Sequence, residues 1–299
     1  MNYNEEQNLR IAYIEEIIRN YLPEEKGYQK TVLEAMNYSV LAGGKRIRPM
    51  LILETYRLFA KDNDKVLEPF IAAIEMIHTY SLVHDDLPAI DNDDYRRGRK
   101  TTHVVYGEAM AILAGDALLN YAYEVATRAF DLTEDTNRLL QVAKALKVLA
   151  RKPGIYGMIG GQVVDVELTN SEIPKEKLNF IYELKTSALI EASMMIGAIL
   201  AGANDKELLV VEEAARNIGL AFQIQDDILD VTSSVEVLGK PINSDEKNNK
   251  TTYVTIEGIN KAQKDVEKMS KIAIDNLTSL NKENQFLFEL IHKLINREK

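Results

Sequence analysis

The residues best suited to chemistry lie in one stretch, "SLVHDDLPAIDNDDYRRGRK", at positions 81–100. Acidic residues come first in this stretch, and basic residues follow them directly. Such a stretch is either a solvated loop, or its carboxylates hold a cation and its basic side chains hold an anion. The aspartates are Asp85, Asp86, Asp91, Asp93 and Asp94, and the basic residues are Arg96, Arg97, Arg99 and Lys100.

A second acidic cluster, "FQIQDDILD", contains Asp226, Asp227 and Asp230. On a helix that turns about 100° per residue, Asp226 and Asp230 differ by about 40°, so they lie on one face in adjacent turns. The neighbouring residues are apolar, and an unpaired buried charge costs several kcal/mol. Apolar packing therefore does not account for this cluster.

The first cluster needs a bend before it matches this geometry. Asp85 and Asp91 are six residues apart and would face different directions on a regular helix. Pro88 lies between them, lacks an N–H group and collides with the carbonyl of His84. We predict that the chain bulges there and absorbs two residues, which puts Asp91 in the place four residues after Asp85. Both clusters would then present paired carboxylates, an oxygen-lined site that suits Mg²⁺; the alternative is two solvated acidic helix ends.

Other basic residues could hold anions. In "LAGGKRIRPM", Lys45, Arg46 and Arg48 follow two glycines and precede a proline that can start a helix. Glycines let backbone N–H groups approach a ligand, and a helix N-terminus favours anions. Lys185 and Thr186 interrupt an apolar helix in "YELKTSALI". Metal and basic side chains without a Gly-x-x-x-x-Gly-Lys-Ser/Thr loop point to diphosphates rather than to a nucleotide triphosphatase.

The long polar segment 233–253 adds Lys240, Lys247 and Lys250. Each of these lysines could equally be an ordinary surface residue. His78 is seven residues before Asp85, two helical turns away on nearly the same face, and we expect it to belong to the same site.

The elements that must position these residues are helices. Apolar residues recur at helical spacing, and alternating strand-like segments with Asn-Gly or Asp-Gly turns are absent. No linker divides the chain, so we predict a single all-α domain over residues 1–299. The predicted helices span 4–20, 28–42, 50–60, 66–86, 104–129, 134–150, 155–168, 174–200, 205–231, 258–277 and 283–296.

Composition limits the remaining options. The chain has 299 residues, a net charge of −10 and no cysteine. The negative charge argues against binding to nucleic acid or an anionic membrane, and the lack of cysteine excludes thiolate chemistry. The N-terminus does not read as a signal peptide, and the apolar run 192–203 is too short to span a bilayer. We therefore expect a soluble cytoplasmic protein.

Taken in order, these motifs resemble the trans-prenyl diphosphate synthase family, and most closely its bacterial farnesyl diphosphate synthases. The resemblance covers essentially the whole chain. It implies an isoprenoid-synthase-type helical bundle around a central active-site cavity, normally a homodimer, with the two aspartate clusters on opposed helices. The motifs are "GGKRIRP", "EMIHTYSLVHDDLPAIDNDDYRRG", "GGQVVD", "LKTSALI", "FQIQDDILD" and "GKPINSDEKNNKTTY".

The resemblance also implies roles for residues at matching positions. About three Mg²⁺ per site, with Mn²⁺ as a substitute, would bind Asp85, Asp86, Asp91 and Asp226, with Asp227 and Asp230 in support. The diphosphate of isopentenyl diphosphate would contact Lys45, Arg48, His78 and Arg97. The allylic diphosphate would contact Arg96, Lys185, Thr186, Gln223, Lys240 and Lys250. The groups that stabilise the carbocation would be Lys185, Thr186 and Gln223. Asn249 stands where many bacterial members have glycine, so the resemblance does not define the backbone shape of that loop.

Product length would depend on Tyr80. In the resembled family, a bulky residue five positions before the first aspartate closes the floor of the product tunnel. Tyr80 holds that position, about 7.5 Å of helix below Asp85. Together with the two-residue insertion before Asp91, it implies farnesyl diphosphate, made from isopentenyl diphosphate and dimethylallyl or geranyl diphosphate. Core packing is the alternative role for Tyr80.

Other functions stay open at this point. A synthase that makes geranyl or geranylgeranyl diphosphate would keep every motif. A non-catalytic partner subunit would usually lose one aspartate motif, and both are intact here. A terpene cyclase is disfavoured because it would have no use for Lys45, Arg48 and Arg97.

Overall fold

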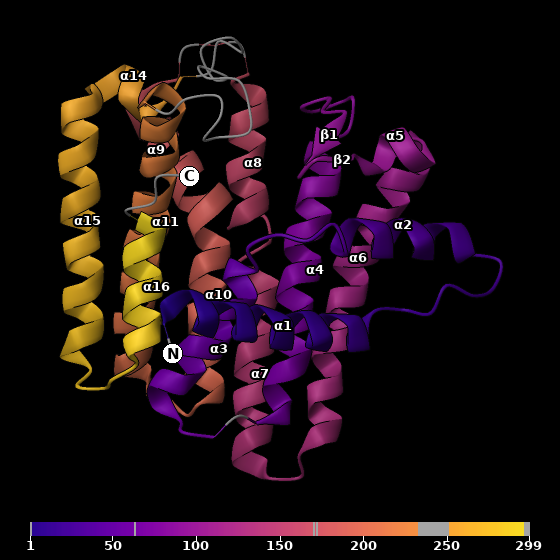
Figure 1. Cartoon of the computed structure of the whole chain (residues 1–299), viewed down its shortest axis with the longest axis horizontal. Helices are drawn as coiled ribbons and strands as arrows, with labels where there is room; N and C mark the ends of the chain where they lie inside the picture. Colours follow the sequence, from indigo (N-terminus) through magenta and orange to yellow (C-terminus); the bar gives the residue numbers. More distant parts are fainter. Residues whose placement is uncertain (1, 63, 170, 172, 233–250, 296–299) are drawn as a thin grey trace. The chain divides into compact units, whose positions relative to one another are not determined.

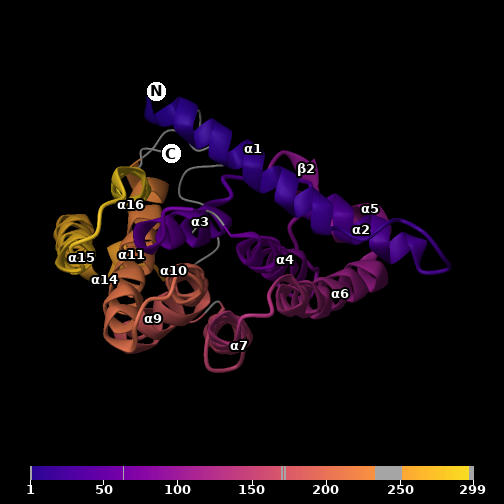
Figure 2. The ribbon, with the colours of Figure 1, turned by 90° about the horizontal axis from the view of Figure 1, so that it is seen from below.

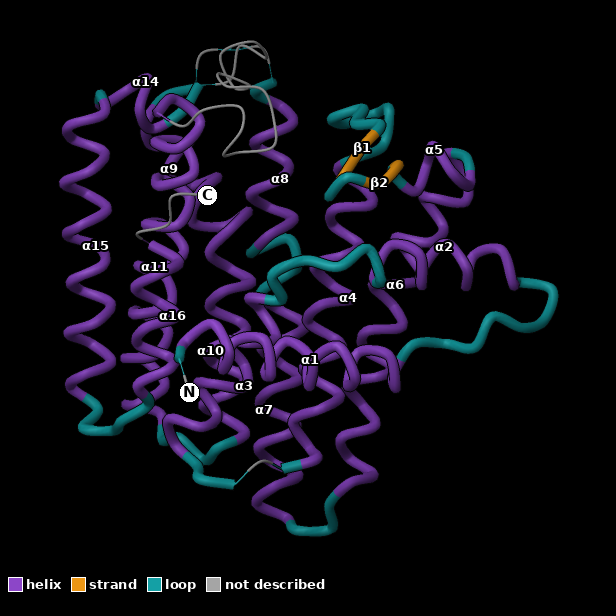
Figure 3. The backbone as a smooth tube through the Cα atoms, viewed as in Figure 1, coloured by secondary structure: helices purple, strands orange, loops and turns teal. Residues whose placement is uncertain are grey.

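The computed structural model describes residues 2–62, 64–169, 171, 173–232 and 251–295. Most of these residues are helical, and the two short strands are the only sheet among them (Figure 3). The predicted all-α fold class is therefore confirmed. Lys240, Lys247, Asn249 and Lys250 lie outside the described residues.

Contacts between residues group the chain into two compact units. Unit 1 comprises Met1–Leu53 and Ala60–Lys147, and unit 2 comprises Glu54–Phe59 and Val148–Lys299. The single domain expected over residues 1–299 stays a prediction.

Unit 1 is built around one central helix, α4 (Glu68–Asp85). This helix packs against α6 on one side and α1 on another, and it also contacts α2 (Figure 2). The other elements are α1 (Tyr3–Tyr21), α2 (Lys30–Val40), the start of α3 (Ile47–Phe59), η1 (Lys65–Leu67), α5 (Thr102–Tyr106), α6 (Glu108–Thr127), η2 (Arg128–Leu132) and most of α7 (Thr136–Arg151).

Helix α4 is apolar nearly all round, which suits a helix that is covered on every side. Pro69 occupies its first turn, where the missing N–H group costs no hydrogen bond. By length and composition, Lys65–Asp85 could also cross a membrane, but 78% of the apolar window is buried inside the protein. Core helices commonly have these properties, so we read α4 as the core of unit 1.

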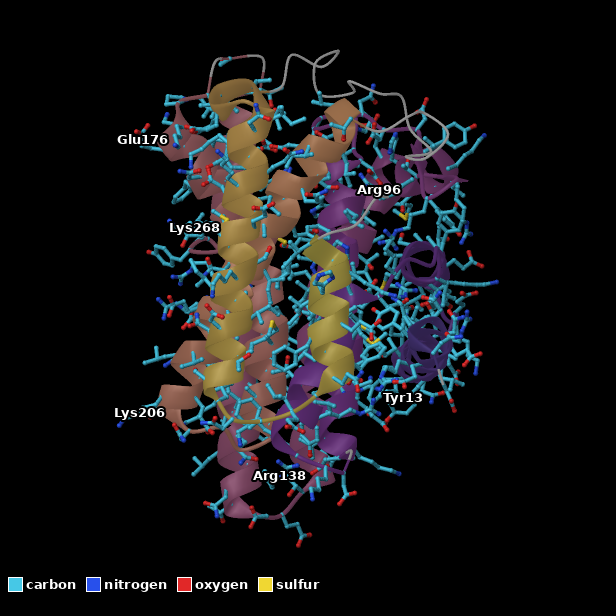
Figure 4. All side chains as sticks on the ribbon, turned by 60° about the vertical axis from the view of Figure 1, so that its left-hand side comes forward. Tyr13, Arg96, Arg138, Glu176, Lys206 and Lys268 are labelled. Atoms are coloured by element: carbon cyan, nitrogen blue, oxygen red, sulfur yellow. The ribbon has the colours of Figure 1, made fainter. Side chains whose placement is uncertain are left out.

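Unit 2 is centred on the long helix α11 (Asp205–Thr232). Helices α15 and α16 and the element η3 pack against it, as does α10, in which every residue is buried (Figure 1). Lys268 projects outward from α15 (Figure 4). The other elements are α8 (Met158–Glu167), α9 (Lys175–Ile181), the π-helical turn η3 (Tyr182–Ser187), α10 (Ala188–Leu200), α14 (Tyr253–Glu257), α15 (Ile259–Ser279) and α16 (Gln285–Ile295).

The predicted helices agree with the structure within a few residues, with three differences. The helix predicted over 104–129 is divided at Gly107 into α5 and α6. The helix predicted over 174–200 widens into a π-helical turn at Tyr182–Ser187. The short helix α14 was not predicted; Thr252 caps its first turn by accepting a hydrogen bond from the backbone N–H of Thr255.

The sequence also gave no signal for the short hairpin of unit 1. Strand β1 (Tyr95–Arg96) pairs antiparallel with β2 (Arg99–Lys100), and Tyr95 lies opposite Lys100. The two turn residues, Arg97 and Gly98, have φ angles of 52° and 74°. A two-residue turn with positive φ at both positions matches the twist of a hairpin, but arginine is an unusual residue for it. The hairpin fixes the positions of Arg96 and Arg97 just after the first acidic cluster.

Candidate active site

The first acidic cluster begins where α4 ends. The backbone N–H of Asp91 donates to the carbonyl of Asp85 at 2.9 Å. In a regular helix, that carbonyl would accept from the residue four positions later. The chain therefore absorbs two residues around Pro88, and the bulge predicted there is confirmed. Asp91 is exposed and Asp85 is half-buried, one at each end of this hydrogen bond.

Asp86 is buried and holds Arg96. The Nε of Arg96 donates to both carboxylate oxygens of Asp86, at 2.7 and 2.9 Å, and its Nη2 lies 2.5 Å from Oδ1. Burial raises the pKa of Asp86, and the hydrogen bonds from Arg96 oppose that rise. Asp86 thus orients a residue that was predicted to bind the allylic diphosphate. A metal at Asp86 would have to share oxygens that Arg96 already uses.

Arg48, His78 and Arg97 come together in unit 1. Nη1 of Arg48 lies 3.1 Å from Nε2 of His78. The guanidinium of Arg97 donates to the carbonyl of Gly43 and lies against Gly44, where a Cβ would stand 2.6 Å from Nη1. These contacts bring three of the four residues predicted for isopentenyl diphosphate into one place. The fourth, Lys45, is exposed on the loop that leads to Arg48.

The charges of this cluster suit an anion. Burial, followed by the positive charge of Arg48, Arg97, Arg96 and Arg46, lowers the pKa of His78 well below its usual value. Burial also lowers the pKa of Arg48 to about 10, with Arg97 adding to the effect. At neutral pH both arginines stay charged while His78 is neutral. The cluster therefore combines fixed positive charge with an imidazole that can donate or accept a hydrogen bond.

Arg46 is a structural residue whose role was not predicted. It is buried and has a φ of 48°, an uncommon conformation for a residue other than glycine. Its Nε donates to Glu15 at 2.6 Å, its Nη1 to Glu75 at 2.5 Å and its Nη2 to the carbonyl of Val40 at 2.8 Å. These bonds fix the loop that carries Lys45 and Arg48. The one available sequence signal was Glu75, an acidic residue in the apolar helix α4.

Unit 2 brings together the three predicted catalytic residues. Thr186 Oγ1 donates to Gln223 Oε1 at 2.8 Å, and Lys185 Nζ lies 2.7 Å from Asp165 Oδ2. Asp165 is a further site residue that received no role, although it closes the motif "GGQVVD". These residues line a pocket formed by Asp165, Ile173, Leu178, Ile181, Tyr182, Lys185, Thr186, Gln223, Asp227, Thr251 and Thr252.

The second acidic cluster diverges within α11. Asp226 is exposed, whereas Asp227 and Asp230 are buried. Asp227 accepts hydrogen bonds from the hydroxyl of Tyr182 at 2.5 Å and from the backbone N–H of Tyr253 at 2.7 Å. Asp226 is therefore the member of the cluster that is most open to a cation.

No three histidine or acidic side chains converge as a metal site within the described residues. The oxygen donors present still suit a hard cation, because Asp85 and Asp91 are joined through their backbones and Asp91 and Asp226 are exposed. The metal assignments for Asp85, Asp86, Asp91 and Asp226 remain predictions.

Tyr80 is buried in unit 1. Its ring meets the imidazole of His84 edge-on, with 5.8 Å between the ring centroids. Its hydroxyl is buried without a hydrogen-bond partner among the described residues, and burial raises the pKa of the phenol. An unpaired buried hydroxyl lowers stability. The presence of tyrosine at position 80 is therefore explained by the size of its side chain and not by a hydrogen bond.

The fold and these clusters define a class of protein: an all-α protein with two aspartate clusters and basic side chains close to them. A family model described as polyprenyl synthetase matches residues 29–291, and the chain belongs to this family. It is a prenyltransferase of isoprenoid synthesis, as the resemblance of its motifs indicated.

Three known proteins show how similar the chain is to its relatives. It is 41% identical over 290 residues to a geranylgeranyl diphosphate synthase of Cyanophora paradoxa, which covers 96% of this chain and 94% of the relative. It is 45% identical over 240 residues to a farnesyl diphosphate synthase of Geobacillus stearothermophilus, covering 80% of this chain and 79% of the relative. The structure of a geranyltransferase from Legionella pneumophila matches with a TM-score of 0.85 at 32% identity, over 99% of this chain and 97% of that one.

Proposed function

We propose that this prenyltransferase condenses isopentenyl diphosphate with dimethylallyl or geranyl diphosphate and releases farnesyl diphosphate. The observation that carries this proposal is the presence of basic side chains at two separate places, one in each unit. Arg48, His78 and Arg97 form the first, and Lys185 with its pocket forms the second. A reaction that joins two diphosphates needs two such anion sites.

Each cluster would hold one substrate. Lys45, Arg48, His78 and Arg97 bind the diphosphate of isopentenyl diphosphate. Neutral His78 adds a hydrogen bond there without adding charge. The side chains for the allylic diphosphate are Arg96, Lys185, Thr186 and Gln223, together with Lys240 and Lys250 outside the described residues.

The reaction would depend on Mg²⁺. Asp85, Asp91 and Asp226 would hold Mg²⁺, which would supply positive charge to neutralise the leaving diphosphate. The allylic C–O bond breaks, the double bond of isopentenyl diphosphate attacks the carbocation, and a proton then leaves, with the departed diphosphate as its acceptor. The oxygens of Thr186 and Gln223, already 2.8 Å apart, direct their dipoles at positive charge. No side chain needs to act as a nucleophile, in agreement with a chain that has no cysteine.

Tyr80 supports a product of fifteen carbons. Its ring is buried five residues before Asp85 and has His84 against its edge, so it can block the growth of an apolar chain. Known relatives are named for both farnesyl and geranylgeranyl products, which makes product length the open part of the proposal.

The test is to incubate the purified protein with isopentenyl and dimethylallyl diphosphates, with Mg²⁺ or EDTA, and to measure product length. We expect a fifteen-carbon diphosphate with Mg²⁺ and none with EDTA. A twenty-carbon product would contradict the proposed length while keeping the chemistry. No product under either condition would contradict the activity itself.

Replacing the tyrosine tests its role as the floor. Tyr80→Ala should lengthen the product to twenty carbons or more, because the smaller side chain leaves room below Asp85. Tyr56→Ala, a second buried tyrosine, is the control and should leave product length unchanged. If Tyr80→Ala still gives fifteen carbons, Tyr80 is a core residue and does not set product length.

A further inference from the structure

We propose that Asp227 is a positioning residue. Its carboxylate fixes the π-helical turn η3, which carries Lys185 and Thr186, and joins it to the start of α14. This inference rests on the proposed function, because it concerns how the allylic pocket is shaped. It assigns Asp227 a role different from that of Asp226, although the two are neighbours in one acidic cluster.

A single oxygen of Asp227 joins three elements. Oδ2 accepts from the hydroxyl of Tyr182, the first residue of η3, at 2.5 Å. The same oxygen accepts from the backbone N–H of Tyr253, the first residue of α14, at 2.7 Å. Asp227 is only 3% exposed, and hydrogen bonds to a charged acceptor are roughly twice as strong as neutral ones. The carboxylate therefore fastens α11 to both neighbours at once.

Asp227 belongs to a stripe of α11 that faces η3. Three residues at intervals of four contact the π turn, and such spacing separates successive members by about 40° on the helix. The three pairs are Gly219 with Ser187, Gln223 with Thr186, and Asp227 with Tyr182. A Cβ on Gly219 would lie 2.5 Å from the Cβ of Ser187, so the two elements are in close contact there.

Asp226 lies outside this stripe. It is rotated by about 100° from Asp227 on the helix and is exposed. Two adjacent carboxylates thus face different surroundings, one toward the π turn and one toward solvent. Asp226 therefore lies outside the stripe on the exposed side of α11, whereas Asp227 contributes to the fold of the pocket.

The π turn needs such support. A π-helical turn is rare and occurs mostly where function requires it. Here it is held by side chains at both ends, through Tyr182 at its start and Thr186 near its finish. Losing the first bond should let η3 move, and Lys185 and Thr186 would move with it. The expected effect is on the allylic substrate and not on metal binding.

Four variants test this assignment: Tyr182→Phe, Asp227→Asn, Asp227→Ala and Asp226→Asn. Phenylalanine removes the hydroxyl that donates to Asp227 and that also accepts, at 3.3 Å, from the backbone N–H of Tyr253. Asparagine removes the charge but keeps an oxygen that can accept both hydrogen bonds, whereas alanine removes the acceptor. Tyr56→Phe, a buried tyrosine of unit 2 outside the pocket, controls for the loss of a buried hydroxyl. For each variant, KM for both substrates, kcat and the Mg²⁺ concentration for half-maximal rate are measured.

We expect Tyr182→Phe to lower kcat/KM for the allylic diphosphate about tenfold, as the loss of a hydrogen bond to a charged group would. KM for isopentenyl diphosphate and the Mg²⁺ requirement should not change. Asp227→Asn should keep more activity than Asp227→Ala, and only Asp226→Asn should raise the Mg²⁺ requirement. If Asp227→Asn raises the Mg²⁺ requirement as Asp226→Asn does, Asp227 is a metal ligand and the assignment is wrong.

A measurement without substrate separates this proposal from the proposed function. Melting temperatures are compared for Tyr182→Phe, Asp227→Ala and the double variant. Because both residues serve one interaction, the double variant should melt no lower than Asp227→Ala alone. If the losses in melting temperature add in the double variant, the proposed positioning role of Asp227 is wrong. A wild-type protein without prenyltransferase activity would overturn the proposed function and leave this cycle valid.

Discussion

His78 shows how its surroundings set the properties of a single residue. Its imidazole lies 3.1 Å from Arg48 and carries a pKa that burial and four arginines hold below its ordinary value. An imidazole that is neutral in this setting can donate or accept a hydrogen bond with a substrate without adding a charge that repels the arginines. The same shift also has a consequence for stability that can be measured.

The free energy of unfolding should decrease as the pH is lowered, because His78 has a lowered pKa in the folded protein. The folded-state pKa is lower than the unfolded value of about 6.5, so the unfolded chain binds the proton first as pH falls. At pH 5.5 this costs at most about 1.4 kcal/mol of unfolding free energy. We expect the wild type to lose up to that amount relative to His78→Asn between pH 7.5 and 5.5, measured by urea unfolding. Parallel curves for the two proteins would contradict this, and His292→Asn, at an exposed site, is the control.

Asp86 and Asp93 both lie near Arg96, but they should contribute differently. Asp86 is buried and accepts two hydrogen bonds from it, whereas Asp93 is 54% exposed and 3.8 Å away. Removing one partner of a buried pair costs about 3–5 kcal/mol, and we reduce this to about 2 kcal/mol because Arg96 is 33% exposed.

Asp86→Ala should therefore lower the free energy of unfolding by about 2 kcal/mol and raise KM for the allylic diphosphate. Asp93→Ala should cost less than about 1 kcal/mol. Chemical denaturation and steady-state kinetics measure both effects. Equal losses in the two variants would mean that the contact with Asp86 has no special role.

At the level of secondary-structure elements, the turn after α4 leads to a prediction about the position of Asp91 relative to Asp85. Asp91 reaches its position because two residues are absorbed around Pro88, and its N–H bonds to the carbonyl of Asp85. Deleting Pro88 and Ala89 together should let the helix continue and leave Asp91 four residues after Asp85. Deleting Ala89 alone should rotate Asp91 by about 100°.

The double deletion should therefore keep activity within a few-fold of the wild type, whereas the single deletion should lose most of it. The rate at saturating Mg²⁺ and the Mg²⁺ concentration for half-maximal rate distinguish the two. A double deletion as inactive as the single one would show that the turn itself is needed, beyond its register.

Local sequence patterns predicted most elements because the helices are long and amphipathic or fully buried. The π turn at Tyr182–Ser187 escaped prediction, since it depends on contacts with Gln223 and Asp227 far along the chain. The left-handed conformation of Arg46 was not predicted for the same reason, because Arg46 is held by hydrogen bonds to Glu15 and Glu75 on other helices. The bulge at Pro88 was predictable because a proline imposes it locally.

The residues of the candidate site also fall into two groups, those recognisable from local sequence and those recognisable only from the structure. Residues proposed to bind ligands, such as Arg48 and Lys185, belong to short motifs that can be recognised in the sequence. Residues that hold them in place, such as Asp165 and Arg46, are recognised only when distant segments come together. Asp86 had been assigned to the metal from its motif alone, and the structure shows that it also has a partner in Arg96.

At the scale of the whole molecule, exposed apolar residues on the surface of unit 1 are relevant to dimer formation. Helices α5 and α6 expose Val104, Val105, Ile112 and Leu113 close together in sequence. Exposed apolar side chains that gather on neighbouring elements commonly mark a surface that another protein covers. We propose that a second copy of the chain covers this one, as the homodimer expected from the family requires.

Leu113→Glu should therefore shift the protein from dimer to monomer, because a carboxylate placed in an apolar interface loses its hydration without gaining a partner. Light scattering after size-exclusion chromatography should give about twice the chain mass of 33.8 kDa for the wild type and the chain mass for the variant. Leu209→Glu is the matched control, since Leu209 is 66% exposed on α11 against 49% for Leu113 on α6. A charge at Leu209 should leave the dimer intact. If both variants stay dimeric, α6 does not form the interface, and a monomeric wild type would remove the homodimer altogether.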